Sequence, residues 1–408
     1  MTLQQHQNDP LEGIFSNALR RKRNIISNRD ALRSDYVPEH LPFRTQQLTT
    51  IGQLLSPILS SSRPSNLLVY GKTGTGKTAV TRYVTSRLAA KCESSKIPAS
   101  FVYCNTKMAG TEYRVLSELA SGIGLKVPFT GLAVSEVLSR IQAYMKEKGL
   151  HTVLVMDEID FLVRSFGDDL LYDLTSSSDK IAPGFLSLIG ISNDLQFKEE
   201  LGARVLSRLS EEELVFPPYS ATELKTILVE RAGLAFNSGA YNEEAINLCA
   251  ALSGSEHGDA RRAVDLLRIA SEVAEREGAE QLEEKHVRIA LQKIDQDRVS
   301  EALKTLPLHA KLVLLATMKA EDDSSLKASS GAVYERYCAL CTKSGLDPLT
   351  TRRVSGLLTE LDTLGLVSAT VVNYGRYGRT KKITPQISHA VVEQALSSDD
   401  YLKHLIVS

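Results

Sequence analysis

The feature that most constrains the fold is a glycine-rich segment of eight residues that follows an apolar run at residues 66–70 and precedes a helical pattern. It matches the GxxxxGK[ST] pattern in full and reads Gly71-Lys72-Thr73-Gly74-Thr75-Gly76-Lys77-Thr78. In that setting the glycines let consecutive N–H groups point at phosphate oxygens, and the start of the helix adds its positive end. The segment predicts a nucleotide site in which Lys77 contacts the β- and γ-phosphates and the Thr78 hydroxyl coordinates Mg²⁺.

The sequence around this segment has the pattern of a parallel β-sheet. Apolar runs at residues 66–70, 100–103, 152–156 and 185–191 alternate with helical patterns. Continuous apolar strands separated by helices indicate a sheet that is covered on both faces. The third run ends in Asp157 and Glu158, at the end of the strand where open α/β sheets bind ligands. We expect Asp157 to orient Mg²⁺ and Glu158 to polarise the attacking water.

The remaining chain divides into two further parts. Pro217 and Pro218 interrupt the pattern, and no buried strand is evident from there to about residue 366. Residues 219–298 carry helical periodicity, and a third part adds helices around 308–319, 330–344 and 351–364 and a hairpin pattern at 366–384. We therefore expect an α/β core with an N-terminal lead-in at 1–217, a small helical domain at 218–298, and a C-terminal domain at 299–408.

The C-terminal domain has the pattern of a winged helix. Residues 350–382 hold six basic and two acidic side chains, a net charge of +4, whereas the whole chain has a net charge of −1. The last of its helices has a polar and basic first turn, as in a helix that enters the major groove, and the hairpin tip suits a wing on phosphates or in the minor groove. The expected DNA contacts are Thr351, Arg352, Arg353 and Ser355 on the helix and Arg376, Tyr377, Gly378, Arg379 and Lys381 on the wing. A winged helix that contacts protein is the alternative.

Composition excludes several classes of protein. Hydrophobic residues make up 43% and charged residues 24%, the balance of a globular protein. No run approaches the roughly 18 apolar residues of a membrane span, and the first residues lack the pattern of a secretory signal, which predicts a cytoplasmic protein. Cys338 and Cys341 are the only cysteines of the five with metal-ligand spacing. One such pair is too few for structural zinc, so we expect neither zinc nor a disulfide framework.

The pairing of the glycine-rich loop with Asp157 and Glu158 resembles the AAA+ ATPases. The resemblance implies that Asn193, after the fourth apolar run, senses the γ-phosphate and that Arg261 reaches the nucleotide from the start of a helix. Asp259 is a plausible N-cap there, which would place Arg261 in the first helical turn. Arg204 matches an arginine finger that acts on the ATP of a neighbouring subunit.

The order of motifs along the chain resembles the archaeal replication initiators, relatives of the eukaryotic origin recognition complex and cell-division-control proteins. The motifs are the basic residues 20–23, VPEHLPFR (37–44), GKTGTGKT (71–78), MDEID (156–160), GISND (190–194), EEELVFPPY (211–219), HGDARRAVDLL (257–267) and GRYGRTK (375–381). The resemblance covers nearly the whole chain. It implies that Val37, Pro38 and Tyr219 help to bind the adenine, and that a helical insertion around residues 111–131 touches DNA.

The resemblance also implies a function. We expect an ATP-dependent initiator, associated with the nucleoid, that binds and deforms double-stranded origin DNA and helps to recruit an MCM-type helicase with other initiator subunits. ATP, ADP and Mg²⁺ are the expected ligands, with slow hydrolysis as a switch. A transcription regulator of the signalling-ATPase type is the competing interpretation, although such proteins usually add a sensor or repeat region. A clamp-loading or repair ATPase would share the core but predicts a different C-terminal domain.

Overall fold

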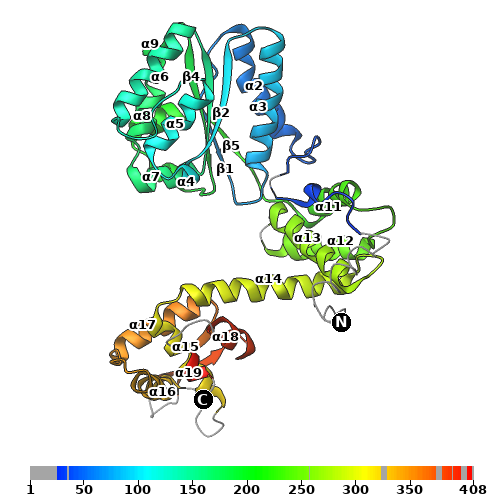
Figure 1. Ribbon diagram of the computed structural model, residues 1–408, viewed down its shortest axis with the longest axis vertical. Coiled ribbons are helices and arrows are strands. Elements are labelled where there is room, and N and C mark those ends of the chain that lie inside the picture. Colours follow the sequence, from blue (N-terminus) through cyan, green and yellow to red (C-terminus); the bar gives the residue numbers. More distant parts are fainter. Residues whose placement is uncertain are drawn as a thin grey trace, which may run out of the picture. The chain divides into compact units, whose positions relative to one another are not determined.

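The computed structural model describes residues 25–34, 36–256, 258–322, 329–373, 379–387, 389–396 and 402–406 (Figure 1). The chain divides into two compact units, Met1–Arg288 and Ile289–Ser408. No helix within these described ranges is long and apolar enough to cross a membrane.

The first unit is built on a parallel sheet of five strands in the order β2-β3-β4-β1-β5. The strands are β1 (Leu67–Tyr70), β2 (Ala99–Asn105), β3 (His151–Asp157), β4 (Phe185–Ser192) and β5 (Glu212–Val215). Every residue of β3 and β4 is buried, as expected for central strands that are covered on both faces. The first four strands were predicted from their apolar runs, and the sheet confirms the predicted α/β class.

Helices cover both faces of this sheet (Figure 1), and each face packs through apolar side chains. On one face, α2 (Thr45–Leu55) and α3 (Lys77–Ser94) pack on side chains from β1, β3 and β4. The other face packs against a second group of helices. These are α4 (Thr106–Ala109), α5 (Glu112–Gly122), α6 (Val134–Lys148), α7 (Ile159–Phe166), α8 (Asp169–Thr175), α9 (Ser178–Ile181) and α10 (Ala203–Leu209).

Strand β5 was not predicted. It pairs with β1 at the edge of the sheet, and Glu212, Glu213 and Val215 are exposed. An edge strand with exposed carboxylates has no continuous apolar run, so the pattern that revealed the four other strands is missing here.

A helical lid completes the first unit. It contains α11 (Ala221–Ala235), α12 (Glu243–Glu256), α13 (Ala260–Glu277) and the first residues of α14 (Glu284–Thr305). Helix α11 begins with a capping box between Ser220 and Glu223. The lead-in packs on this lid, because η1 (Asp30–Leu32) contacts α11 and α13, and Ile26 forms a β-bridge with Phe236. The basic residues 20–23 lie outside the described residues.

The second unit has the predicted winged-helix fold. Its central helix α15 (Leu308–Asp322) is buried at every residue from Leu312 to Met318. Helices α16 (Ser330–Lys343) and α17 (Thr351–Thr363) precede an antiparallel hairpin of β6 (Val367–Asn373) and β7 (Arg379–Pro385). Helices α18 (His389–Leu396) and α19 (Lys403–Ile406) add buried side chains to the same core. Arg376, Tyr377 and Gly378 of the predicted wing tip lie outside the described residues.

Candidate nucleotide-binding site

The glycine-rich loop lies between β1 and α3, and two of its glycines are required by their surroundings. Gly74 has φ +67°, and a Cβ atom there would lie 1.6 Å from a carboxylate oxygen of Asp259 in the lid. Gly76 has φ +92°, and its Cβ atom would lie 2.9 Å from the Tyr219 hydroxyl oxygen. The loop therefore needs glycine for its backbone conformation and also for close contact with neighbouring segments.

Lys77 is the buried cation of this loop, with only 4% of its surface exposed. Its ammonium group donates hydrogen bonds to the carbonyl oxygens of Gly71 and Lys72, at 2.6 and 2.7 Å. Burial lowers the pKa of Lys77 to about 8, against the opposing effect of the Asp157 carboxylate. Burial removes the water that would otherwise stabilise the charged ammonium group. Phosphate oxygens placed beside it would therefore stabilise its protonated form.

Asp157 and Thr78, the residues expected to hold Mg²⁺, are in direct contact. The Thr78 hydroxyl donates to Oδ2 of Asp157 at 2.7 Å, and the Tyr103 hydroxyl donates to the same oxygen at 2.7 Å. The backbone N–H of Glu158 donates to Oδ1 of Asp157 at 3.0 Å. Oxygen atoms of a carboxylate and a hydroxyl suit Mg²⁺, so these residues fit the expected metal.

Glu158 follows in a backbone conformation that is rare for a non-glycine residue, with φ +55°. Thr106 is fully buried, and its hydroxyl lies 3.1 Å from the carbonyl oxygen of Asp157 and 2.5 Å from that of Glu158. Thr106, the first residue of α4 directly after β2, therefore holds the backbone of both acidic residues. Positive φ angles that are fixed in this way are found preferentially at functional sites.

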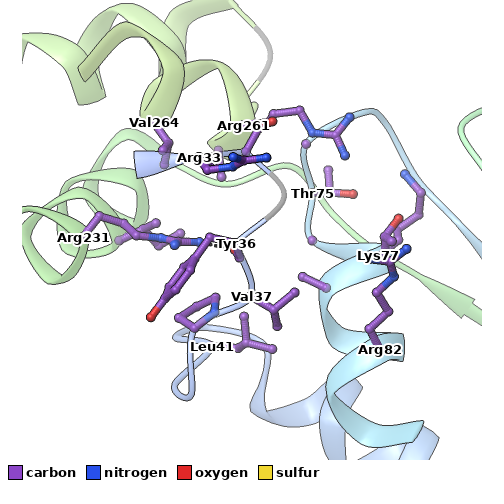
Figure 2. A pocket seen from close by; sticks show the side chains of 18 of the residues that line it. Arg33, Tyr36, Val37, Leu41, Thr75, Lys77, Arg82, Arg231, Arg261 and Val264 are labelled. Carbon is purple, nitrogen blue, oxygen red and sulfur yellow. Dashed lines mark hydrogen bonds between the residues drawn. The ribbon is translucent and has the colours of Figure 1, made fainter. Parts of the chain in front are cut away.

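These residues surround one cavity of about 820 Å³ between the core, the lead-in and the lid (Figure 2). That volume lies in the range of small-molecule and cofactor sites. Of the predicted site residues, the structure places the following around the cavity: Val37, Pro38, Thr73, Gly74, Thr75, Gly76, Lys77, Thr78, Asp157, Glu158, Asn193, Tyr219 and Arg261. Gly71 and Lys72, at the start of the loop, do not line the cavity, but their carbonyl groups accept hydrogen bonds from Lys77. Arg204 is exposed on α10 and does not line this cavity.

The start of α13 is fastened to the glycine-rich loop. Asp259 caps the helix, as predicted, by accepting the N–H of Arg262, and Thr73 donates its hydroxyl to Asp259 at 3.3 Å. The N–H of Ala260 donates to the carbonyl oxygen of Gly74 at 3.1 Å. These bonds place Arg261 in the first turn of α13, beside the cavity (Figure 2), where its charge helps to lower the pKa of Lys77.

Two arginines that were not predicted as site residues, the buried Arg44 and the half-buried Arg231, hold the lead-in at the cavity. Arg44 donates to the carbonyl oxygens of Thr75 at 3.0 Å and Pro217 at 2.7 Å, and its guanidinium lies 3.8 Å from the centre of the Tyr219 ring. Arg231 of α11 donates to the carbonyl oxygens of Ala31 at 3.1 Å and Tyr36 at 2.9 Å. Arg44 ends the VPEHLPFR motif, which was the only signal for either residue.

The predicted insertion contains α5 and the loop that follows it. Val115, Leu116 and Leu119 of α5 are buried in the core. Beyond the helix, Phe129 is 79% exposed, and the Arg114 guanidinium lies 5.7 Å from the centre of its ring. The insertion therefore presents an aromatic side chain beside a positive charge.

On the winged helix, α17 has one apolar and one polar face. Val354, Leu357, Leu358 and Leu361 are buried, whereas Thr351, Arg352, Arg353 and Ser355 are exposed. Thr350 caps the helix by accepting the N–H of Arg353. Lys381 of β7 approaches the same helix, with its ammonium nitrogen 3.4 Å from the Thr359 hydroxyl oxygen. Arg379 is the first residue of β7.

Matches to family models agree with this architecture. An AAA domain matches residues 60–197, the Cdc6 AAA+ ATPase-type lid domain matches residues 225–292, and the C-terminal winged helix domain of CDC6 matches residues 301–395. Together with the sheet and its glycine-rich loop, they define an AAA+ ATPase with a Cdc6-type lid and winged helix.

Similar proteins narrow this class to one family. The chain is 44% identical over 402 residues to an ORC1-type DNA replication protein of Thermococcus kodakarensis, which covers 98% of this chain and 97% of the relative. It is 47% identical over 399 residues to ORC1-type DNA replication protein 1 of Aeropyrum pernix, which covers 97% of this chain and all of that protein. The chain belongs to the archaeal ORC1/Cdc6 family of DNA replication proteins.

Solved structures agree with this assignment. The structure of the Aeropyrum pernix ORC1 protein in complex with DNA matches 93% of this chain and 99% of its own, with 47% identity and a TM-score of 0.76. Cdc6p from Pyrobaculum aerophilum shares the fold, with a TM-score of 0.60 at 24% identity over 92% of this chain and 99% of its own.

Proposed function

We propose that this protein is an ATP-dependent DNA replication initiator. It binds double-stranded origin DNA through its winged helix and its AAA+ insertion, deforms that DNA, and helps to recruit an MCM-type replicative helicase. The observation that carries the proposal is the similarity over nearly the whole chain to Aeropyrum pernix ORC1, whose structure was solved in complex with DNA. We assign residues 1–217 to the ATPase core with its lead-in, 218–298 to the lid and 299–408 to the DNA-binding domain.

The nucleotide part of the proposal uses the cavity between core and lid. The loop amides and Lys77 bind the phosphates of ATP or ADP, and Thr78 and Asp157 hold Mg²⁺, which would neutralise phosphate charge. Glu158 polarises the attacking water. We assign the remaining cavity residues as follows: Asn193 and Arg261 contact the γ-phosphate, and Val37, Pro38 and Tyr219 bind the adenine.

Hydrolysis by one chain is slow in this proposal, because a charge that stabilises the transition state comes from a neighbour. Arg204 is exposed and does not line the nucleotide cavity of its own chain. This position suits a residue that acts on the ATP of another initiator subunit. Arginine fingers contribute about 10³- to 10⁵-fold to the rate in other nucleotide hydrolases. ATP and ADP then favour different lid positions, because only ATP offers a γ-phosphate to Asn193 and Arg261.

The DNA part of the proposal uses two separate surfaces. The exposed first turn of α17, with Arg352 and Arg353, enters the major groove, and the basic residues of the wing bind phosphates. The insertion supplies the second contact through Phe129 and Arg114. Apolar side chains that enter between base pairs unstack them and bend the duplex, which supports a role for Phe129 in deforming DNA.

The experiment that tests the proposal is recovery of fragmented genomic DNA by the purified protein at physiological salt, with ATP and with ADP, followed by sequencing. Enrichment at one or a few intergenic loci with repeated elements is the expected result. Recovery of many promoters would instead support a transcription regulator, and uniform recovery would leave a nonspecific DNA-binding ATPase. A variant that combines Arg352→Ala and Arg353→Ala should lose this enrichment while it still binds ATP.

A further inference from the structure

The side chain of Tyr103 has no role in the site as proposed so far, although it touches the centre of that site. Tyr103 lies on β2, next to β3, where Asn105 pairs with Asp157. Its hydroxyl donates to Oδ2 of Asp157 at 2.7 Å. Tyr103 also lines the nucleotide cavity.

A second element holds the Tyr103 ring in place. Arg82 lies one helical turn after Thr78 on α3, and its guanidinium is 3.8 Å from the centre of the Tyr103 ring. A guanidinium at this distance attracts the face of an aromatic ring. The helix that carries Thr78 and the strand that carries Tyr103 therefore meet at one carboxylate, that of Asp157.

The hydrogen bonds of Asp157 differ at its two oxygens. Oδ1 accepts the backbone N–H of Glu158, while Oδ2 accepts the hydroxyl protons of both Thr78 and Tyr103. Because the Thr78 hydroxyl donates its hydrogen bond to Oδ2, the lone pairs of the hydroxyl oxygen remain available for a cation. A carboxylate rotates easily about its terminal bond. Oδ2 of Asp157 must therefore be fixed if the Thr78 hydroxyl hydrogen is to point in one direction.

We propose that Tyr103 is a positioning residue for the Mg²⁺ site. It fixes the Asp157 carboxylate, which in turn directs the lone pairs of the Thr78 hydroxyl toward the metal. The inference rests on the proposed function, since it takes Thr78 and Asp157 as the residues that hold Mg²⁺. Residues that orient metal ligands in this way typically change metal affinity by about 10- to 100-fold when they are mutated.

The variant Tyr103→Phe tests this inference, because it removes the hydroxyl and keeps the ring that Arg82 contacts. Tyr70→Phe is the matched control. Tyr70 is also a strand tyrosine of this sheet, and its hydroxyl donates to the Glu213 carboxylate at 2.6 Å, away from the cavity. Calorimetric titration with ADP, first in excess EDTA and then at increasing Mg²⁺, measures the metal requirement without relying on hydrolysis.

We expect Tyr103→Phe to bind ADP normally in EDTA and to need about tenfold more Mg²⁺ for half of the metal-dependent gain in affinity. Tyr70→Phe should behave as the wild type does in both conditions. An unchanged Mg²⁺ requirement in Tyr103→Phe would overturn the inference. An equal loss of ADP affinity with and without Mg²⁺ would also overturn it, because it would indicate that Tyr103 only shapes the cavity. Failure of the wild type to bind ADP at all would instead overturn the proposed function, and the inference with it.

Discussion

Contact between the lid and the glycine-rich loop predicts a specific penalty for alanine at position 74. In Gly74→Ala the new methyl group would lie 1.6 Å from Oδ1 of Asp259, so the Asp259 side chain must leave its place. Asp259 then no longer caps α13. The substitution costs about 1–2 kcal/mol for a left-handed alanine and about 1 kcal/mol more for the lost cap.

Gly278→Ala separates these two effects. Gly278 ends the same helix with φ +72°, close to the +67° of Gly74, and no atom lies within 4 Å of its Cβ position. This variant should lose only the backbone contribution of about 1–2 kcal/mol. In differential scanning calorimetry, the transition of the ATPase unit should therefore fall about 2–4 °C further in Gly74→Ala than in Gly278→Ala.

The same comparison applies to nucleotide binding. Loss of the cap destabilises the conformation in which α13 contacts the loop, by about 1 kcal/mol. If ADP binds this conformation, its affinity should fall about fivefold in Gly74→Ala. Gly278→Ala should bind ADP as the wild type does. Because Asp259→Ala removes the clashing carboxylate, it should reduce the additional cost of Gly74→Ala by about 1 kcal/mol. Equal unfolding temperatures for the two glycine variants, or strictly additive costs for Gly74→Ala and Asp259→Ala, would refute this account of the lid contact.

Three further predictions concern the cavity and the wing. Lys77→Ala should abolish ATP binding in a filter assay and leave much of the DNA binding, since the winged helix has its own core. Equal loss of DNA binding by this variant and by the nucleotide-free wild type would contradict this modular organisation. Because the pKa of Lys77 is lowered to about 8, about half of the free protein lacks this proton at pH 8, and a bound phosphate restores it. ADP binding near pH 8 should therefore take up as much as about half a proton and weaken as pH rises further. Titrations in buffers of different ionisation enthalpy measure that uptake, which Lys77→Arg should abolish. Arg376→Ala combined with Arg379→Ala should weaken binding to every DNA sequence and reduce the salt dependence by up to about two phosphate contacts, and an unchanged slope would argue against a wing on phosphates.

Most of the fold could be predicted because its elements carry local patterns. Strands β1, β3 and β4 are almost entirely buried, so their apolar runs are continuous, and the apolar residues Val354, Leu357, Leu358 and Leu361 of α17 form its buried face. Strand β5 lacks that signal because its carboxylates face solvent at the edge of the sheet. Strand β2 also lies at an edge and is mostly half-buried, but it keeps the apolar run Phe101-Val102-Tyr103, which was enough to predict it.

The candidate site divides in a similar way. Lys77, Thr78 and Asp157 belong to motifs with fixed spacing, so the sequence alone predicted that they would meet. Tyr103 and Arg231 carry no such signal, because each acts through a partner on another element: the Asp157 carboxylate and the Tyr36 carbonyl group. Only the folded chain defines these pairs.

The start of α13 combines two contacts that bear on the proposed nucleotide switch. Asp259 contacts the glycine-rich loop through Thr73, and Arg261, two residues later, lines the cavity. A ligand that moves either residue must move the other, because both belong to the first turn of one capped helix. A γ-phosphate drawn to Arg261 would therefore also act on the contact between Asp259 and the loop. In the proposed switch, this coupling would let the lid differ between ATP and ADP, since a ligand shifts a conformational equilibrium only through contacts that differ between the two states.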